Sequence, residues 1–271
     1  MANSLREFKL IAKQKGLIKE IIKKQLSRKF YKYLKNHDGK YYVDNIEYKN
    51  YQEINENANL LIQYEAEEDK AGHVEVNKPL EIIYEDEEFI VVNKPSHLLS
   101  IPTYKENDAV FNRLLAYFHD TNYFPHIMTR LDEDTNGLVL VAKDRLSCCL
   151  TSDITKKYIA ITNNKLKDDR GLIELNIKRS DDSIKRMVAS DGKVAKTLYQ
   201  FIKEKDGLYY YDVTLLTGRT HQIRVHFSHL ASPLIGDKLY GNDDNVDLGL
   251  QCYYLKFINP ITKKEIEIEL S

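Results

Sequence analysis

The chain has 271 residues, a length that allows one large domain or a large and a small one. Its 42% hydrophobic and 30% charged residues are typical of an ordinary globular protein. No stretch approaches the ~18 apolar residues of a membrane helix, and the first residues hold no apolar signal-peptide core, so we expect a cytoplasmic protein with no membrane partner.

Cysteine usage argues against bound metals. The three cysteines are Cys148, Cys149 and Cys252, and they include no C-x-x-C pair. This number and spacing indicate neither a disulfide framework nor a zinc site. Because the chain also carries no metal or dinucleotide motif, we expect no metal and no cofactor.

The net charge of -1 hides a strong contrast along the chain. Residues 1–35 hold eleven basic and two acidic side chains, a net of +9, whereas residues 36–88 hold four basic and fifteen acidic ones, a net of -11. A cationic segment is the expected footprint for the phosphate backbone of a nucleic acid. A solvated basic helix explains it equally well.

The N-terminal part is expected to mix helix and short strands. Residues 8–34 have apolar positions at helical spacing, with a break at Gly16. Residues 41–43 and 60–62 are predicted to form short strands around a polar loop, and the acidic run at 65–72 is the predicted linker.

From residue 80 onward strands dominate the pattern. Strands are predicted at 82–84, 89–92 and 138–142, and Asp206-Gly207 is the turn of a hairpin between 198–202 and 209–213. Helices are expected at 109–119 and 145–155. Hairpins with intervening helices predict an α+β domain with a mostly antiparallel sheet.

Two polar segments stand out against this background. Residues 129–137 read T-R-L-D-E-D-T-N-G before a buried apolar run, and residues 217–226 read T-G-R-T-H-Q-I-R-V-H. On its own the first is most simply a solvated acidic turn. In the second, seven of ten residues can form hydrogen bonds and alternate with Ile223 and Val225, so we expect them to share one face of an extended chain.

The order R-L-D-x-x-T-x-G and then G-R-T-H-Q-I-R-V-H resembles the RluA-type pseudouridine synthases, which isomerise uridine to its C-glycoside within RNA. The resemblance runs from about residue 80 to the C-terminus. Further matching segments are I-Y-E-D at 83–86, F-I-V-V-N-K-P at 89–95, K-Y-I-A at 157–160, K-R-M-V at 185–188, G-K-V-A-K-T at 192–197 and P-L-I-G-D-K-L-Y-G at 233–241.

Upstream, residues 27–45 resemble the small S4 RNA-binding module in a degenerate form. The two resemblances imply an S4-like domain at 1–70, a linker at 71–79 and a catalytic domain at 80–271. The implied class is α+β: a pseudouridine synthase fold, with a mostly antiparallel mixed sheet, flanking helices and a central cleft, preceded by a small S4-like α/β domain.

The resemblance also implies roles for individual residues. Asp132 matches the catalytic carboxylate, and Arg224 the arginine that pairs with it and keeps it deprotonated. Tyr158 matches the active-site tyrosine, whose ring can pack on the base and whose hydroxyl is a candidate for removing the proton at C5. Arg130 matches the arginine that fills the gap left by an unstacked uridine.

The remaining site residues are assigned to RNA contacts. Arg219 and His221 are expected to contact phosphate or order their loop, and Lys94 to line the cleft. In the basic N-terminal segment, Arg28, Lys29 and Lys32 are the expected contacts.

Several points stay open at this stage. The carboxylate can attack the sugar, attack the base or assist elimination to a glycal; ribosomal and transfer RNA are both possible substrates, and a monomer is the default. An alternative function is an RNA-binding or ribosome-assembly factor on the same scaffold with little turnover. A glycosidase would need a second catalytic carboxylate opposite Asp132, and only Glu133 and Asp134 neighbour it in sequence.

Overall fold

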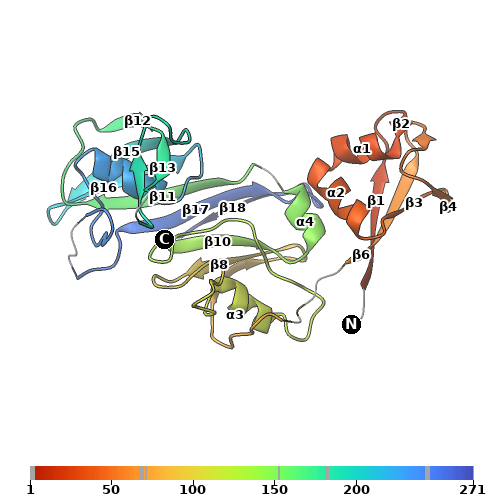
Figure 1. Ribbon diagram of the computed structural model, residues 1–271, viewed down its shortest axis with the longest axis horizontal. Helices are drawn as coiled ribbons and strands as arrows, with labels where there is room; N and C mark the ends of the chain where they lie inside the picture. The colour runs from red at the N-terminus through yellow and green to blue at the C-terminus, as the bar shows by residue number, and fades with distance from the viewer. Residues whose placement is uncertain are drawn as a thin grey trace.

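The computed structural model describes residues 4–66, 70, 72–151, 153–180, 183–241 and 245–270. Two bodies of secondary structure follow each other along the chain, a small N-terminal one and a large one built on a long twisted sheet (Figure 1). Within the described residues, no helix combines the length and apolar character needed to cross a membrane.

The N-terminal body is a four-stranded antiparallel sheet covered by two helices. Its strand order is β1-β6-β3-β4, and β2 pairs with β5 beside it. The elements are β1 (Ser4–Ile11), β2 (Gly16–Leu17), α1 (Ile18–Gln25), α2 (Arg28–Asn36), β3 (Lys40–Val43), β4 (Ile46–Tyr48), β5 (Glu53–Ile54) and β6 (Asn59–Ala66).

The predicted helix over 8–34 is therefore only partly right. Its first four residues, 8–11, belong to strand β1, which pairs along its whole length with the distant strand β6, from Ser4 with Ala66 to Ile11 with Asn59. Helix α1 begins just after Gly16, and Ser27 caps α2 by accepting a hydrogen bond from the Phe30 N–H. The predicted strands at 41–43 and 60–62 are confirmed as parts of β3 and β6.

The large body is a ten-stranded sheet of order β12-β15-β16-β11-β17-β10-β8-β7, with β18 paired to β17 and β9 to β10. Every pairing is antiparallel except the short β10–β17 contact, which confirms an α+β fold with a mostly antiparallel mixed sheet. The strands are β7 (Glu81–Glu85), β8 (Phe89–Lys94), β9 (His126–Ile127), β10 (Asn136–Ala142), β11 (Thr155–Thr162), β12 (Arg170–Glu174), β15 (Lys196–Lys205), β16 (Leu208–Leu215), β17 (Leu250–Ile258) and β18 (Glu265–Glu269).

Three helices and a separate hairpin complete this body. They are α3 (Val110–Tyr117), α4 (Arg145–Leu150), α5 (Gln222–His229) and the hairpin of β13 (Ile177–Arg179) with β14 (Arg186–Val188). The predicted helices at 109–119 and 145–155 are confirmed in kind, although α4 ends five residues early because β11 begins at Thr155. The predicted hairpin turn is also confirmed: Asp206 and Gly207 both have positive φ between β15 and β16.

The core of the sheet explains why β8 and β10 are so apolar. Leu138 to Ala142 of β10 and Phe89 to Val92 of β8 are fully buried and pair with each other in the middle of the main hydrophobic cluster. At the start of β10, Gly137 has φ +113°, and a Cβ there would lie 2.2 Å from the Cys252 carbonyl oxygen. Only glycine fits where the loop carrying Asp132 enters the sheet.

The two bodies touch through α2 and α4, which lie side by side in Figure 1. Cys149, Leu146 and Leu150 of α4 pack into the N-terminal core, and the Arg145 guanidinium lies 5.5 Å from the centre of the Tyr33 ring. Residues 67–69 and 71 lie outside the described residues, so the predicted linker boundary stays a prediction.

Candidate active site

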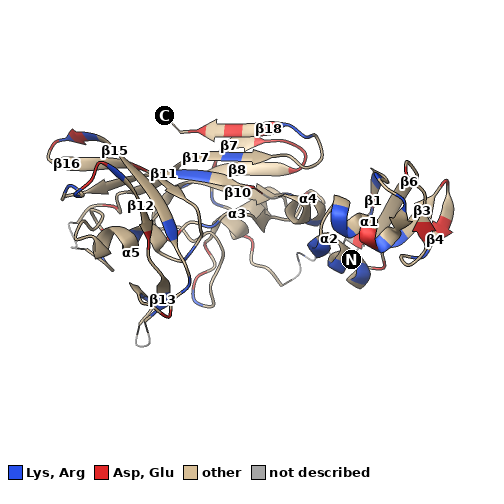
Figure 2. Cartoon of the chain, turned by 90° about the horizontal axis from the view of Figure 1, so that it is seen from above, with Lys and Arg blue, Asp and Glu red and all other residues tan. Residues whose placement is uncertain are grey.

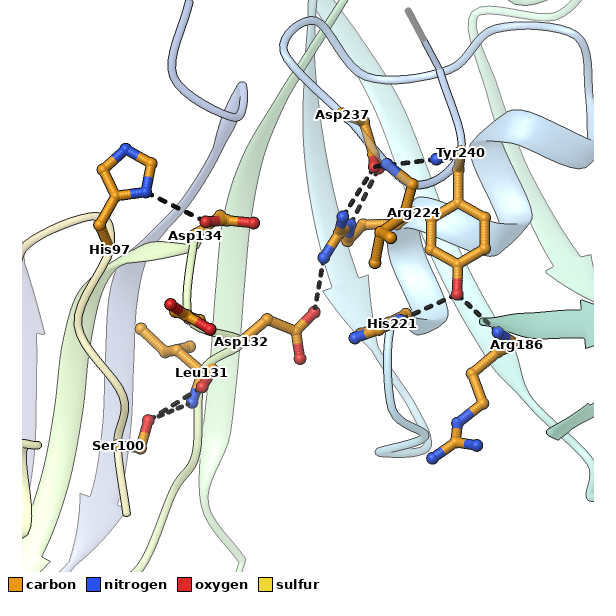
Figure 3. Close-up of polar contacts among 12 residues, drawn as sticks. His97, Ser100, Leu131, Asp132, Asp134, Arg186, His221, Arg224, Asp237 and Tyr240 are labelled. Carbon is orange, nitrogen blue, oxygen red and sulfur yellow. Dashed lines mark hydrogen bonds and ion pairs between the residues drawn. The ribbon is translucent and has the colours of Figure 1, made fainter. Parts of the chain in front are cut away.

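The centre of the site is a carboxylate, a guanidinium and a second carboxylate in a row. Arg224 Nη1 lies 3.8 Å from Asp132 Oδ2, and the same guanidinium forms a bidentate pair with Asp237, at 2.9 Å from Nε to Oδ2 and 2.7 Å from Nη2 to Oδ1 (Figure 3). Arg224 is 3% exposed and Asp237 0%, whereas Asp132 is 26% exposed. Asp132 is therefore the member of the row that a substrate can reach.

Backbone contacts on both sides fix the loop that carries Asp132. The Ser100 hydroxyl accepts from the Leu131 N–H and donates to the Leu131 carbonyl, at 3.0 and 2.9 Å. One residue after Asp132, the Glu133 carbonyl accepts from the Lys94 ammonium at 2.8 Å. The Asp132 carbonyl itself accepts from the Thr135 N–H. The direction of the carboxylate is thus set before any substrate binds.

Lys94 supports this loop from inside the protein. It is fully buried, and its ammonium donates to the carbonyls of Pro95, Leu98 and Glu133. Burial lowers the pKa of Lys94 to about 8, against the opposing attraction of nearby carboxylates led by Asp134. All three ammonium protons have protein acceptors, which argues against the predicted contact of Lys94 with RNA.

Arg224 reaches Asp132 from a helix, so the prediction of an extended chain over 217–226 is wrong. His221 adopts the left-handed conformation at φ +57°, and α5 begins at the next residue. Every residue from Gln222 to Phe227 is buried, so polar and apolar side chains of this helix alike are covered by protein. The alternation that suggested a strand reflects this all-round burial.

The two acids hold the charge of Arg224 in place. Burial alone would lower the pKa of its guanidinium, but the hydrogen bonds and charge of Asp237, with Asp132 behind them, raise it above its ordinary value. Because Asp237 is fully engaged with Arg224, it is unsuited to act as the second catalytic carboxylate of a glycosidase.

Tyr158 lies on β11 beside this row. It is 4% exposed, and it stands opposite Cys252 of β17. Burial, together with the charges of Cys252 and Asp132, raises the pKa of Tyr158 well above its ordinary value. A phenol in this state stays protonated, so its hydroxyl is a poor proton acceptor, and the ring is the part of Tyr158 suited to contact a base.

The other arginines and lysines predicted to bind RNA are all exposed, but they differ in whether their side chains already contact other parts of the protein. The Arg130 side chain is exposed, with no hydrogen bond or ion pair to the described part of the chain. Arg219 is also exposed, although its Nε donates to the Val194 carbonyl at 3.0 Å. Among the N-terminal cations, Arg28, Lys29 and Lys32 are exposed on α2, but Lys29 Nζ lies 3.9 Å from Cys148 Sγ of α4 (Figure 2).

His221 belongs to the site, and among the described residues its imidazole forms a hydrogen bond through one ring nitrogen only. Its Nδ1 lies 2.8 Å from the Tyr240 hydroxyl, and that hydroxyl also accepts from the Arg186 N–H at 2.7 Å (Figure 3). The Arg224 guanidinium lies over the Tyr240 ring, 5.4 Å from its centre. Burial lowers the pKa of His221, so the ring is neutral near pH 7.

Three residues of the site carried no role in the sequence analysis. Asp237 and Tyr240 lie in the P-L-I-G-D-K-L-Y-G segment. In the sequence, only the presence of polar residues among apolar ones in this segment could have marked them as site residues. The third, Lys156, is one of two adjacent lysines, and its ammonium lies 5.5 Å from the centre of the Tyr158 ring. Burial lowers the pKa of Lys156, against attraction by Cys252 and Asp132. Across the described ranges, no three His, Cys, Asp or Glu side chains converge as metal ligands.

Comparisons with known proteins agree with this geometry. A family model described as RNA pseudouridylate synthase matches residues 88–229. The chain is 33% identical over 220 residues to an uncharacterized RNA pseudouridine synthase, YjbO, of Bacillus subtilis, covering 76% of this chain and 77% of that protein. It is 34% identical over 234 residues to ribosomal large subunit pseudouridine synthase D of Vibrio parahaemolyticus, covering 77% of this chain and 71% of that protein.

Among solved structures, human RNA pseudouridylate synthase domain containing 1 superposes with a TM-score of 0.61 at 23% identity. The superposition covers 72% of this chain and 84% of the human one, and it supports the fold. Taken with the family match and the sequence relatives, it leads to one conclusion: the chain belongs to the RluA-type RNA pseudouridine synthases and isomerises uridine to pseudouridine in RNA.

Proposed function

We propose that Asp132 is the catalytic carboxylate of this isomerisation. The observation that carries the proposal is the row from Asp237 through Arg224 to Asp132, in which only Asp132 is open to solvent. A guanidinium fixed by a buried acid is a charge-assisted partner that holds the direction of the neighbouring carboxylate. Attack on sugar or base, or assistance to elimination, needs a carboxylate held in place.

We assign the neighbouring side chains by their freedom to move. Arg130 is exposed and unpaired in the described structure, which suits an arginine that fills the gap left by the flipped nucleotide. Tyr158 supplies a fixed aromatic surface beside Asp132 for the extruded uracil. Arg219 contacts phosphate through the part of its guanidinium not bound to Val194.

For the substrate, we propose structured RNA of the large ribosomal subunit. The support is that relatives from Vibrio parahaemolyticus and Rickettsia bellii are named ribosomal large subunit pseudouridine synthases, at 34% identity in both cases. We further propose that residues 1–70 form an S4-like domain that contacts this RNA through Arg28 and Lys32, joined by 71–79 to a catalytic domain at 80–271. A cytoplasmic monomer is the working form.

The test compares pseudouridine across total RNA from cells that carry the wild-type gene, no gene, or Asp132→Asn. We expect at least one uridine of large-subunit RNA to be converted only in wild-type cells. Purified Asp132→Asn should fold normally, because Asp132 is a partly exposed side chain, and should form no product on that RNA. Equal product from Asp132→Asn would remove Asp132 from the reaction; a modified transfer RNA in place of ribosomal RNA would correct only the substrate.

A further inference from the structure

His221 stands at a position where the direction of one hydrogen bond can be deduced. Of its two ring nitrogens, Nδ1 contacts the Tyr240 hydroxyl, and Nε2 has no partner among the described residues. In Figure 3 the imidazole lies between Tyr240 and Asp132, with its second nitrogen on the Asp132 side. His221 is half-buried, so a ligand held beside the Asp132 carboxylate can reach that nitrogen.

Of the two hydrogen-bond partners of the Tyr240 hydroxyl, only one can accept its proton. Burial raises the pKa of Tyr240, so the phenol is protonated and must donate. Its other partner is the Arg186 N–H, a group that can only donate. The phenol therefore donates to Nδ1 of His221, and the neutral imidazole carries its own proton on Nε2. Tyr240 thus fixes His221 as a hydrogen-bond donor on the side that faces Asp132.

The charges around the imidazole favour a neutral acceptor for this donor. Asp132 faces it from the loop before β10, Arg224 from α5, Arg186 from β14 and Asp237 from the loop after α5. A phosphate placed at Nε2 would approach the Asp132 carboxylate, and two anions at a partly buried site repel each other. A carbonyl oxygen of the reacting base carries no net charge and suits a neutral N–H.

Uracil has a symmetry that such a donor can use. Isomerisation replaces the N1–C1′ bond by a C5–C1′ bond, so the detached base must turn before it is rejoined. A half-turn about the line through N3 and C6 exchanges N1 with C5 and also exchanges O2 with O4. One fixed donor therefore meets a carbonyl oxygen both before and after the turn. Cytosine has an amino group at position 4 and would present a donor to a donor in one of the two orientations.

We propose that the Nε2–H of His221, oriented by Tyr240, binds a carbonyl oxygen of the flipped uracil in both orientations and so selects uridine. This role rests on the proposed active site around Asp132. His221 is then a specificity-determining residue that touches the base, and Tyr240 is the residue that positions it.

The experiment compares wild type with His221→Asn on three RNA substrates that differ only in the target base. The probe is the RNA fragment on which the wild type forms pseudouridine, made with uridine, 2-thiouridine or 4-thiouridine at the target, because a thiocarbonyl is a weak acceptor. For wild type, single-turnover rates should fall about tenfold with either thio-base, the usual worth of one hydrogen bond. His221→Asn should slow the uridine substrate by a similar factor and lose its sensitivity to both thio-bases. Asparagine tolerates the left-handed conformation, so the backbone is kept.

Two further variants separate this role from a structural one. Tyr240→Phe removes only the hydroxyl and should reduce the thio-base effect as His221→Asn does. Tyr117→Phe removes a hydroxyl of α3 that donates to Glu85 of β7, and it should behave as wild type. If His221→Asn slows all three substrates by the same factor, or if it lowers the salt dependence of RNA binding by about one phosphate contact, the proposal is overturned. If the wild type modifies no RNA at all, the assignment of activity fails instead.

Discussion

Asp237 makes the strongest prediction about stability, because it is the buried counter-ion of a buried cation. Asp237→Asn keeps the shape of the side chain but removes its charge and turns an amide N–H toward the guanidinium N–H groups. Arg224 would be left with Asp132 at 3.8 Å as its remaining carboxylate. Removing one partner of a buried ion pair costs about 3–5 kcal/mol.

This cost can be measured by thermal or urea unfolding. In a domain of this size, each kcal/mol shifts Tm by about 2–4 °C, so we expect Tm to fall by about 6–20 °C. The matched control is Asp247→Asn, whose side chain is 70% exposed and pairs with His97 at the surface; it should change stability by no more than about 0.5 kcal/mol. An Asp237→Asn protein within 1 kcal/mol of wild type would show that the buried row is not held by this pair.

Three more outcomes follow from the structure. Arg130→Ala should slow modification of a folded RNA far more than that of a short unstructured one, because a nucleotide that flips out leaves a gap in the base stack only in the folded RNA. Equal slowing of both RNAs in product assays would contradict this prediction. The pKa of Lys94 is about 8 in the folded protein, below its value in the unfolded chain, so the unfolded chain binds more protons at pH values between the two. Urea titrations should therefore show wild type gaining stability relative to Lys94→Met as pH rises from 8 to 10. A difference in stability that does not change with pH would contradict this prediction. Deleting residues 1–70 should weaken RNA affinity and flatten its salt dependence, and an unchanged salt slope would exclude the basic helices as contacts.

The sequence predicted the ion pair of Asp132 with Arg224 because the motifs that carry the two residues are local. Asp132 and Arg224 are 92 positions apart, yet each sits in a short, recognisable run, and their pairing followed from the family resemblance. The large sheet was equally accessible, since alternating and apolar runs such as 138–142 are set by burial on the two faces of a strand. The individual roles of these side chains remain predictions until variants are tested.

What sequence reasoning missed depends on contacts between distant segments. Local periodicity predicts helix over residues 8–11, because the pairing of β1 with β6 is not visible in it. Alternation predicts an extended chain over residues 217–226, because a helix buried on all sides loses its polar face. The function of Asp237 and Tyr240 depends on where α5 lies, so their residue types alone gave no assignment.

Gly137 has a consequence for how this protein can vary. It touches no reacting group, yet any side chain there would collide with the β17 backbone at Cys252 and force β10 away from it. Because the loop of Asp132 enters the sheet through this residue, such a shift would carry the Asp132 carboxylate out of line with Arg224. If a library of all single substitutions is selected for the ability to modify RNA, the active variants should carry as few substitutions at position 137 as at position 132.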